Sequence, residues 1–299
     1  MVWKQGLFAG AYFLCFILSA LALLVWQKRS KGRRNPLPKE IRLLRAPGET
    51  QLNLVHRFDE DAILWVALAA GIPAGVSAGL LVLAGMLPPI FRVSGFFLSI
   101  LIFLGLFFFG VRWFVGKARE RGDRYLGYFG ERLVAEYLDP LKQQGWSLFH
   151  DIPCSSDGRK FNIDHIAVGP QGVFVIETKT RRKGGAQRGV DDYKVYFDGH
   201  DLVWPWGKDS HGLEQAERNA VWMATMLRDG IGRSFYVTPI LVLPGWWVEL
   251  RLGRDSRLCR VVNPKGLLKY LSGGSEILDS SQITLIAAKL ESLSRDVEY

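Results

Sequence analysis

The chain has 299 residues, 48% of them hydrophobic, and a formal net charge of +9. This positive excess points to a membrane surface, a nucleic acid, or both as partners. The three cysteines, Cys15, Cys154 and Cys259, are far apart and form no CxxC or Cys/His cluster. The sequence therefore argues against a zinc site or a disulfide framework, and it fits a reducing compartment.

Three apolar stretches predict membrane-spanning helices at about residues 6–26, 62–86 and 93–113. A span needs roughly 20 apolar residues, and each stretch is long enough. The alternative is a cleaved signal peptide followed by a buried helical hairpin. The first stretch is too long for the apolar region of a signal peptide and has no clean cleavage site. We therefore expect a membrane region over residues 1–115, with the lipid bilayer as a partner.

Lysine and arginine predict the orientation, because cytoplasmic loops collect positive charge. Basic residues crowd positions 28–34 and 112–121, whereas the N-terminus has only Lys4 and the second connection only Arg92. We expect a multi-pass protein with its N-terminus outside, a cytoplasmic loop over residues 27–61, and a cytoplasmic C-terminal domain. The run at 28–34 is interpreted as a topology determinant on anionic lipid rather than as a nucleic-acid surface.

Three glycines lie four residues apart in the second predicted span: Gly71, Gly75 and Gly79. Such a stripe of small residues lets helices approach closely. The partner is either a neighbouring helix of the same chain or a second copy, so a homo-oligomer through this stripe remains an open possibility. Packing within the chain is the default expectation.

From about residue 116 the pattern becomes that of a globular α/β domain, over residues 116–299. Apolar residues at helical spacing predict a helix over 124–141, namely Leu126, Phe129, Leu133, Tyr137 and Leu141, with Val134 and Leu138 beside them. A strand is expected at 146–152, hairpins at 162–180 and 193–205, and further strands at 235–245 and 257–263. Closing helices are expected at 264–271 and 281–294, the first capped by Asn263 with Pro264 at its first position.

The hairpin NIDHIAVGPQGVFVIETKT, residues 162–180, contains the most informative pattern. If its turn is symmetric about Pro170 and Gln171, Asp164 lies opposite Glu177, and Lys179 lies on the same face. Opposed carboxylates about 5 Å apart repel each other unless a proton or a cation lies between them. Because Pro170 does not suit a primed two-residue turn, we expect a somewhat wider loop.

Two carboxylates and a lysine on adjacent strands suit a divalent metal such as Mg²⁺, with Mn²⁺ as the alternative. The metal and the lysine together position a water, lower its pKa and offset charge on a phosphate oxygen. The other interpretation is a solvated strand end where Lys179 only neutralises a carboxylate. The three residues alone do not decide between the two.

The order of motifs resembles the nuclease-related domain, NERD, a family of the PD-(D/E)XK restriction-endonuclease-like superfamily. The residues concerned are Gly130-Glu131, the NIDHIAVGPQGVFVIETK string and LEQAERNA, and the resemblance covers about residues 122–245. It implies an α/β fold with a restriction-endonuclease-like mixed central sheet flanked by helices, here preceded by three transmembrane helices. It also implies that Asp164, Glu177 and Lys179 form the catalytic core. Thr180 and the basic run after it replace the usual Asn and Gly, which leaves the conformation of this loop open.

By the same resemblance Glu131 assists metal binding, so the expected metal ligands are Asp164, Glu177 and Glu131. Gln215 matches a glutamine of the helix after the core. The predicted apolar stripe of this helix is Leu213, Ala216, Ala220, Met223 and Leu227. From spacing alone, Gln215 and Asn219, which lie one turn apart, equally fit solvated positions. His165 points to the opposite face, which favours a structural role.

A basic segment follows the catalytic lysine, with Trp204 and Trp206 further along the chain. Basic residues with aromatic neighbours suit a phosphate backbone and unstacked bases, although basic loops are common on surfaces and both tryptophans also fit a core. The expected nucleic-acid-binding residues are Arg181, Arg182, Lys183 and Arg188.

The sequence thus predicts a membrane-anchored, Mg²⁺-dependent nuclease acting on DNA. The alternative is a non-catalytic module that binds nucleic acid or a partner at the membrane.

Overall fold

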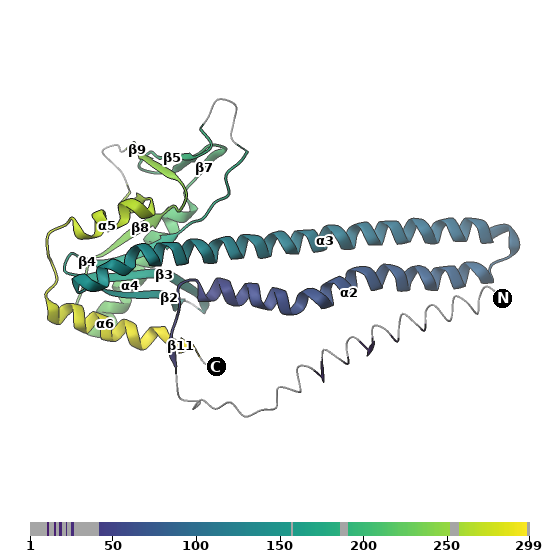
Figure 1. Cartoon of the computed structure of the whole chain (residues 1–299), viewed down its shortest axis with the longest axis horizontal. Helices are drawn as coiled ribbons and strands as arrows, with labels where there is room; N and C mark the ends of the chain where they lie inside the picture. The colour runs from purple at the N-terminus through teal and green to yellow at the C-terminus, as the bar shows by residue number, and fades with distance from the viewer. Residues whose placement is uncertain are drawn as a thin grey trace. The chain divides into compact units, whose positions relative to one another are not determined.

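The structure is a computed structural model that describes residues 42–156, 158–185, 191–251 and 257–297, with isolated positions among the first 26 residues (Figure 1). The first predicted span, at 6–26, and the basic run at 28–34 lie outside the continuously described residues. The chain forms two compact units. Unit 1 contains Leu54–Asp123, and unit 2 contains Leu37–Asn53 and Arg124–Tyr299.

The continuously described part of unit 1 is a pair of apolar helical segments, from α2 (Glu49–Met86) and α3 (Pro89–Leu138). Among the described residues these are the two helices long and apolar enough to cross a membrane. Only 17% and 6% of their most apolar windows are buried. A core helix of a soluble protein is mostly buried, so this exposure favours contact with lipid. The structure thus supports two of the three predicted spans as candidates.

Glycines of α3 make the close contacts between these two segments. A Cβ on Gly95 would lie 2.9 Å from Ala84 Cβ, and one on Gly110 would lie 3.0 Å from the Ala69 carbonyl oxygen. Gly75 and Gly79 of the predicted stripe have open space instead. Gly71 of the stripe is buried, so the packing within the chain uses this glycine together with small residues outside the stripe, and a homo-oligomer through the stripe stays a prediction.

Both long helices extend beyond the predicted spans. The helix α2 begins at Glu49, inside the stretch expected to be a loop. The helix α3 joins the third predicted span to the helix expected at 124–141. The connecting residues RWFVGKARERGD contain no proline, and Lys117 pairs with Glu120 at 3.1 Å one turn away, so nothing in them ends a helix.

Unit 2 is built on a mixed five-stranded sheet in the order β10-β8-β4-β3-β2. The strands β2 (Ser147–Ser156), β3 (Arg159–Gly169) and β4 (Gly172–Thr178) are antiparallel. The strands β8 (Val237–Val242) and β10 (Arg260–Val262) continue the sheet in parallel from β4. The expected mixed central sheet is confirmed.

Helices cover both faces of this sheet. One apolar cluster joins it to α4 (His211–Ile231) and α6 (Ser280–Ser294), and includes Ile166, Met223 and Ile286. The other joins it to the end of α3, to the 3₁₀ helix η1 (Asp139–Gln144) and to α5 (Pro264–Ser272). On α3 the buried stripe contains Val134 and Leu138 rather than the predicted Phe129, which is 56% exposed.

A second, four-stranded sheet has the order β7-β6-β5-β9. The predicted hairpin at 193–205 forms its β5 (Lys194–Phe197) and β6 (Leu202–Trp204). The short β7 (Gly207–Asp209) and β9 (Trp247–Leu250) were not predicted, because three or four residues give no periodic pattern. A third apolar cluster packs this sheet against α4, β8 and β10.

The segment before α2 and the C-terminal strand also belong to unit 2. The strand β1 (Leu43–Leu44) pairs antiparallel with β11 (Arg295–Val297). The α/β unit thus includes residues well before the expected boundary at 116, because a pairing of residues about 250 positions apart leaves no periodic signal in the sequence.

Candidate active site

The hairpin of β3 and β4 has the predicted register. The ladder runs from Gly169–Gly172 to His165–Ile176, with Pro170 and Gln171 as a two-residue turn. The expected wider loop is wrong: Gly172 has φ +131°, which lets the chain turn without an extra residue. The segment before α6 also stabilises this turn, because the Pro170 carbonyl accepts hydrogen bonds from the amides of Ile277 and Leu278, at 2.7 and 3.0 Å.

The β3–β4 ladder ends just before Asp164. The Asp164 carboxylate Oδ2 accepts a hydrogen bond from the Thr178 amide at 2.7 Å. This side chain therefore satisfies a strand amide that has no ladder partner on β3. This hydrogen bond to the backbone restricts the Asp164 side chain to one orientation.

The neighbouring β2–β3 ladder is irregular at the same rung. Asp151 and Asp164 lie between the paired rungs His150–His165 and Ile152–Ile163. Asp151 has φ +49°, the left-handed region that costs an ordinary residue roughly 1–3 kcal/mol. Ile163 and Ile166 nevertheless share one apolar cluster, so the alternation of faces is broken at the rung that contains the aspartates.

Glu177 lies near the end of β4, Lys179 follows that strand, and both side chains contact α4. Lys179 Nζ lies 2.7 Å from Glu177 Oε1 and donates to Gln215 Oε1 at 2.9 Å. Asn219, one helical turn after Gln215, donates to Glu177 Oε2 at 3.1 Å. The predicted shared face of Glu177 and Lys179 is thus observed, and α4 supplies two amides to it.

Glu131 of α3 joins the group from another element. It is 4% exposed, and its Oε2 is buried without a hydrogen-bond partner. The preceding Gly130 lets α3 approach the segment after Lys179, because a Cβ at this position would overlap Thr180 Oγ1. The structure therefore brings Glu177, Lys179 and Gln215 into direct contact, and it places Asp164 and Glu131 close enough to interact electrostatically with Glu177 and Lys179.

Burial and mutual repulsion dominate the electrostatics of these groups. Burial, with the charges of Asp151 and Glu177, raises the pKa of Glu131 to about 8. Burial, with the charges of Glu177 and Glu131, raises the pKa of Asp164 well above its usual value. The pKa of Glu177 is also raised by burial, although Lys179 opposes the shift. Burial lowers the pKa of Lys179, but the attraction of these carboxylates outweighs it and the net shift is upward.

The donor set suits a hard divalent cation, although the side chains do not enclose one. Across the described ranges, no group of three or more His, Cys, Asp or Glu residues is arranged to hold a metal ion. Glu177 contacts Lys179, and Asp164 contacts the Thr178 amide. The unpartnered Oε2 of Glu131 and the repulsion among buried carboxylates are what a bound cation would relieve.

Two basic residues that follow Lys179 in the sequence contact tryptophan rings. Arg181 pairs with Asp209 at 2.6 Å and lies over the Trp204 ring, and Lys183 lies over the Trp246 ring. Both of those tryptophans are buried, whereas Trp206 is 37% exposed. Arg181, Arg182 and Lys183 are all exposed, and Arg188 lies outside the described residues.

Other predictions at this site had mixed outcomes. His165 is fully buried and shares a 2.9 Å Nδ1–Nδ1 contact with His150 of β2. Asn219, which the sequence left as readily solvated, is 4% exposed and bound to Glu177. Asp151 was not predicted at all; its left-handed backbone and its partners become visible only in the tertiary structure.

Comparison with known proteins bears on the same region. No curated protein and no solved structure matches the chain. Residues 126–244 match the family model described as nuclease-related domain, NERD. This match spans Glu131, the β3–β4 hairpin and the first part of unit 2 up to β8. The segment that contains the candidate site is therefore similar in sequence to the nuclease-related domain.

Proposed function

We propose that the protein is a membrane-anchored, metal-dependent nuclease that hydrolyses phosphodiester bonds of DNA. The observation that supports this most is the group of three buried carboxylates, Glu131, Asp164 and Glu177, next to the Lys179 ammonium. Structural ion pairs are usually satisfied, whereas here an oxygen of Glu131 has no partner and two further carboxylates have raised pKa values. The nuclease-related match and the PD-(D/E)XK pattern implied by it agree with this function.

In this proposal Asp164, Glu177 and Glu131 would hold Mg²⁺ or Mn²⁺. The bound cation would lower the pKa of a water and offset charge on the phosphate. Lys179, oriented by Gln215, would donate to the attacking water or to a phosphate oxygen. Asn219 would fix Glu177 through its second oxygen. The exposed cations Arg182 and Lys183 would contact the phosphate backbone of the substrate.

Membrane anchoring is part of the proposal. The exposed apolar lengths of α2 and α3 support it, and so does the placement of basic residues beside them. In this arrangement the N-terminus lies outside, and the nuclease-related unit lies in the cytoplasm. Insertion of the full chain into membranes, followed by protease protection of tagged termini, tests this orientation.

The activity is tested on the full chain in detergent micelles, because residues before α2 belong to unit 2. Labelled single-stranded and double-stranded DNA are incubated with increasing Mg²⁺ or Mn²⁺. Lys179→Met removes the ammonium but keeps a long side chain. Lys142→Met is the matched control, since Lys142 is an exposed lysine paired with Asp139 in η1.

We expect cleavage that needs metal, is lost in Lys179→Met and is unchanged in Lys142→Met. Equal cleavage by all three proteins would refute the assigned site. Metal binding that is lost in Glu177→Gln, without cleavage of either DNA, would favour the non-catalytic binding module instead.

A further inference from the structure

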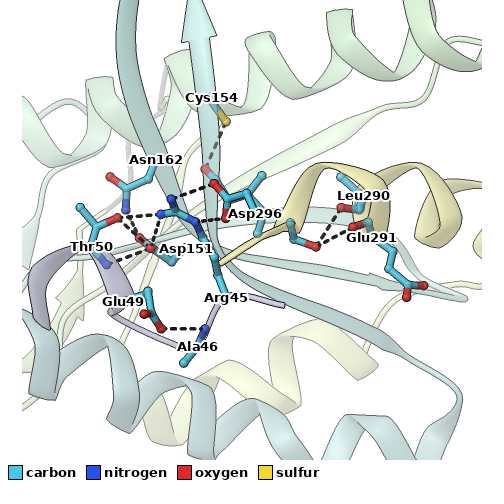
Figure 2. Close-up of polar contacts among 12 residues, drawn as sticks. Arg45, Ala46, Glu49, Thr50, Asp151, Cys154, Asn162, Leu290, Glu291 and Asp296 are labelled. Atoms are coloured by element: carbon cyan, nitrogen blue, oxygen red, sulfur yellow. Dashed lines mark hydrogen bonds and ion pairs between the residues drawn. The ribbon is translucent and has the colours of Figure 1, made fainter. Parts of the chain in front are cut away.

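A polar network is centred on the buried carboxylate of Asp151 (Figure 2). Asp151 is fully buried, and its Oδ2 accepts from Arg45 Nη1 at 2.8 Å, from the Thr50 amide at 2.9 Å and from Thr50 Oγ1 at 2.7 Å. Its Oδ1 accepts from Asn162 Nδ2 at 2.5 Å. One carboxylate thus joins Arg45 and the first turn of α2 to strands β2 and β3.

The same guanidinium also binds the C-terminal strand. Arg45 Nε and Nη2 donate to the two carboxylate oxygens of Asp296, at 2.6 and 2.9 Å. The paired strands β1 and β11 flank this contact. Arg45 therefore has two separable sets of contacts: one to Asp296, which joins the chain ends, and one to Thr50 and Asp151, which reaches the central sheet.

The second set of contacts lies at the rung that positions Asp164. Asp151 is the described non-glycine residue with positive φ, and it occupies the rung of Asp164 in the β2–β3 register. A left-handed residue inside a strand persists only where its surroundings hold it there. Arg45, Thr50 and Asn162 are those surroundings. If Asp151 relaxed to an extended conformation, Asp151 and Asp164 would form a regular strand pair. The Asp164 side chain would then follow the normal alternation of β3 and point away from the Thr178 amide.

We propose that Arg45 and Thr50 are positioning residues for the metal-binding carboxylates, acting through Asp151 on the rung that contains Asp164. The inference rests on the proposed function, because it assigns the two residues to the same metal site. In this proposal the segment that leads into α2 contributes to metal binding by unit 2, in addition to connecting that unit to the apolar helices. Removing a direct hydrogen-bond partner of a metal ligand typically alters metal affinity about 10–100-fold. Arg45 and Thr50 act one step further from the ligands, so we expect an effect at the lower end of this range.

The test uses the full chain in detergent micelles, with Mn²⁺ alone as the first probe. Free Mn²⁺ is measured by electron paramagnetic resonance, and cleavage is measured as a function of Mn²⁺. Thr50→Val removes the hydroxyl at constant shape, and Thr50→Ser restores it. Arg45→Met removes both sets of contacts, whereas Asp296→Asn weakens only the set that joins the chain ends. Circular dichroism and a thermal melt show that each variant is folded.

We expect Thr50→Val and Arg45→Met to bind Mn²⁺ about tenfold more weakly, with cleavage restored by high Mn²⁺. Thr50→Ser should match the wild type. Asp296→Asn should melt earlier but keep its Mn²⁺ affinity within about twofold, which a purely structural role of the network would not predict.

Wild-type affinity in a folded Thr50→Val would overturn the inference while leaving the nuclease in place. A loss of affinity in Asp296→Asn as large as that in Arg45→Met would also overturn it, since the chain ends alone would then matter. Mn²⁺ binding that follows the expected order without any cleavage would support the positioning role and count against the nuclease. A wild type that binds no Mn²⁺ would overturn both.

Discussion

Replacement of Glu131 by glutamine should stabilise the metal-free protein, and more so as the pH rises. Glu131 is 4% exposed, and its Oε2 has no hydrogen-bond partner. Its pKa is raised to about 8 by burial and by neighbouring carboxylates. A group whose folded pKa exceeds its unfolded value is harmless at low pH, where both states bind the proton. It destabilises the fold as the pH rises towards the folded pKa, because the unfolded state alone gains from ionisation.

The size of the effect follows from the two pKa values. The unfolded value is 4.5 and the folded value is about 8. Between pH 5.5 and pH 8.5 the cost of this one carboxyl grows by about 3 kcal/mol, at 1.36 kcal/mol per pKa unit. In a unit of this size about 1 kcal/mol shifts the melting temperature by roughly 2–4 °C. The advantage of Glu131→Gln should therefore grow by roughly 6–12 °C across this pH range.

The assay is thermal unfolding of the full chain in detergent with EDTA, followed by tryptophan fluorescence at pH 5.5, 7.0 and 8.5. The difference between variant and wild type cancels titrating groups that do not interact with Glu131, including His150, whose burial lowers its pKa to about 4. Glu136→Gln is the matched control, because Glu136 is an exposed glutamate on the same helix. We expect its difference from the wild type to be small and constant with pH.

A constant difference between Glu131→Gln and the wild type over the three pH values would refute this reasoning. It would mean that Glu131 either reaches solvent or is already neutralised by a partner. A difference that grows equally in Glu136→Gln would assign the effect to the net charge of the protein rather than to the buried site.

Three further predictions concern the same unit. Mg²⁺ should raise the melting temperature of the wild type more at pH 8.5 than at pH 5.5, because protons and metal compete for the same carboxylates. Thermal melts with and without Mg²⁺ test this, and an equal effect at both pH values would contradict the proposed site. Gly130→Ala should lower stability and metal affinity because its Cβ meets Thr180 Oγ1, and Thr180→Gly in the same chain should restore both; failure of the rescue would show that the contact is not the cause. Gly169→Ala should cost about 1–3 kcal/mol of unfolding free energy, because a Cβ would overlap the Trp146 ring. A melting temperature equal to that of the wild type would contradict this packing.

Local features of the fold could be predicted because their causes lie within short stretches of sequence. The β3–β4 register follows from one turn and the alternation of its flanking residues. The stripe on α4 follows from helical spacing, and all five predicted positions, from Leu213 to Leu227, are buried. Asn263 caps α5 as expected, since its Oδ1 accepts from the Gly266 amide at 2.9 Å.

The sequence by itself determined two apolar segments, an α/β unit and a hairpin that places Glu177 and Lys179 on one face, because each depends on periodicity over a few residues. Only the tertiary structure decided that Asn219 binds Glu177 and that Arg45 and Thr50 bind Asp151. These contacts join residues from 42 to more than 100 positions apart. The packing of the elements brings these residues together. Contacts of this kind follow no regular spacing in the sequence, so they could not be predicted from it.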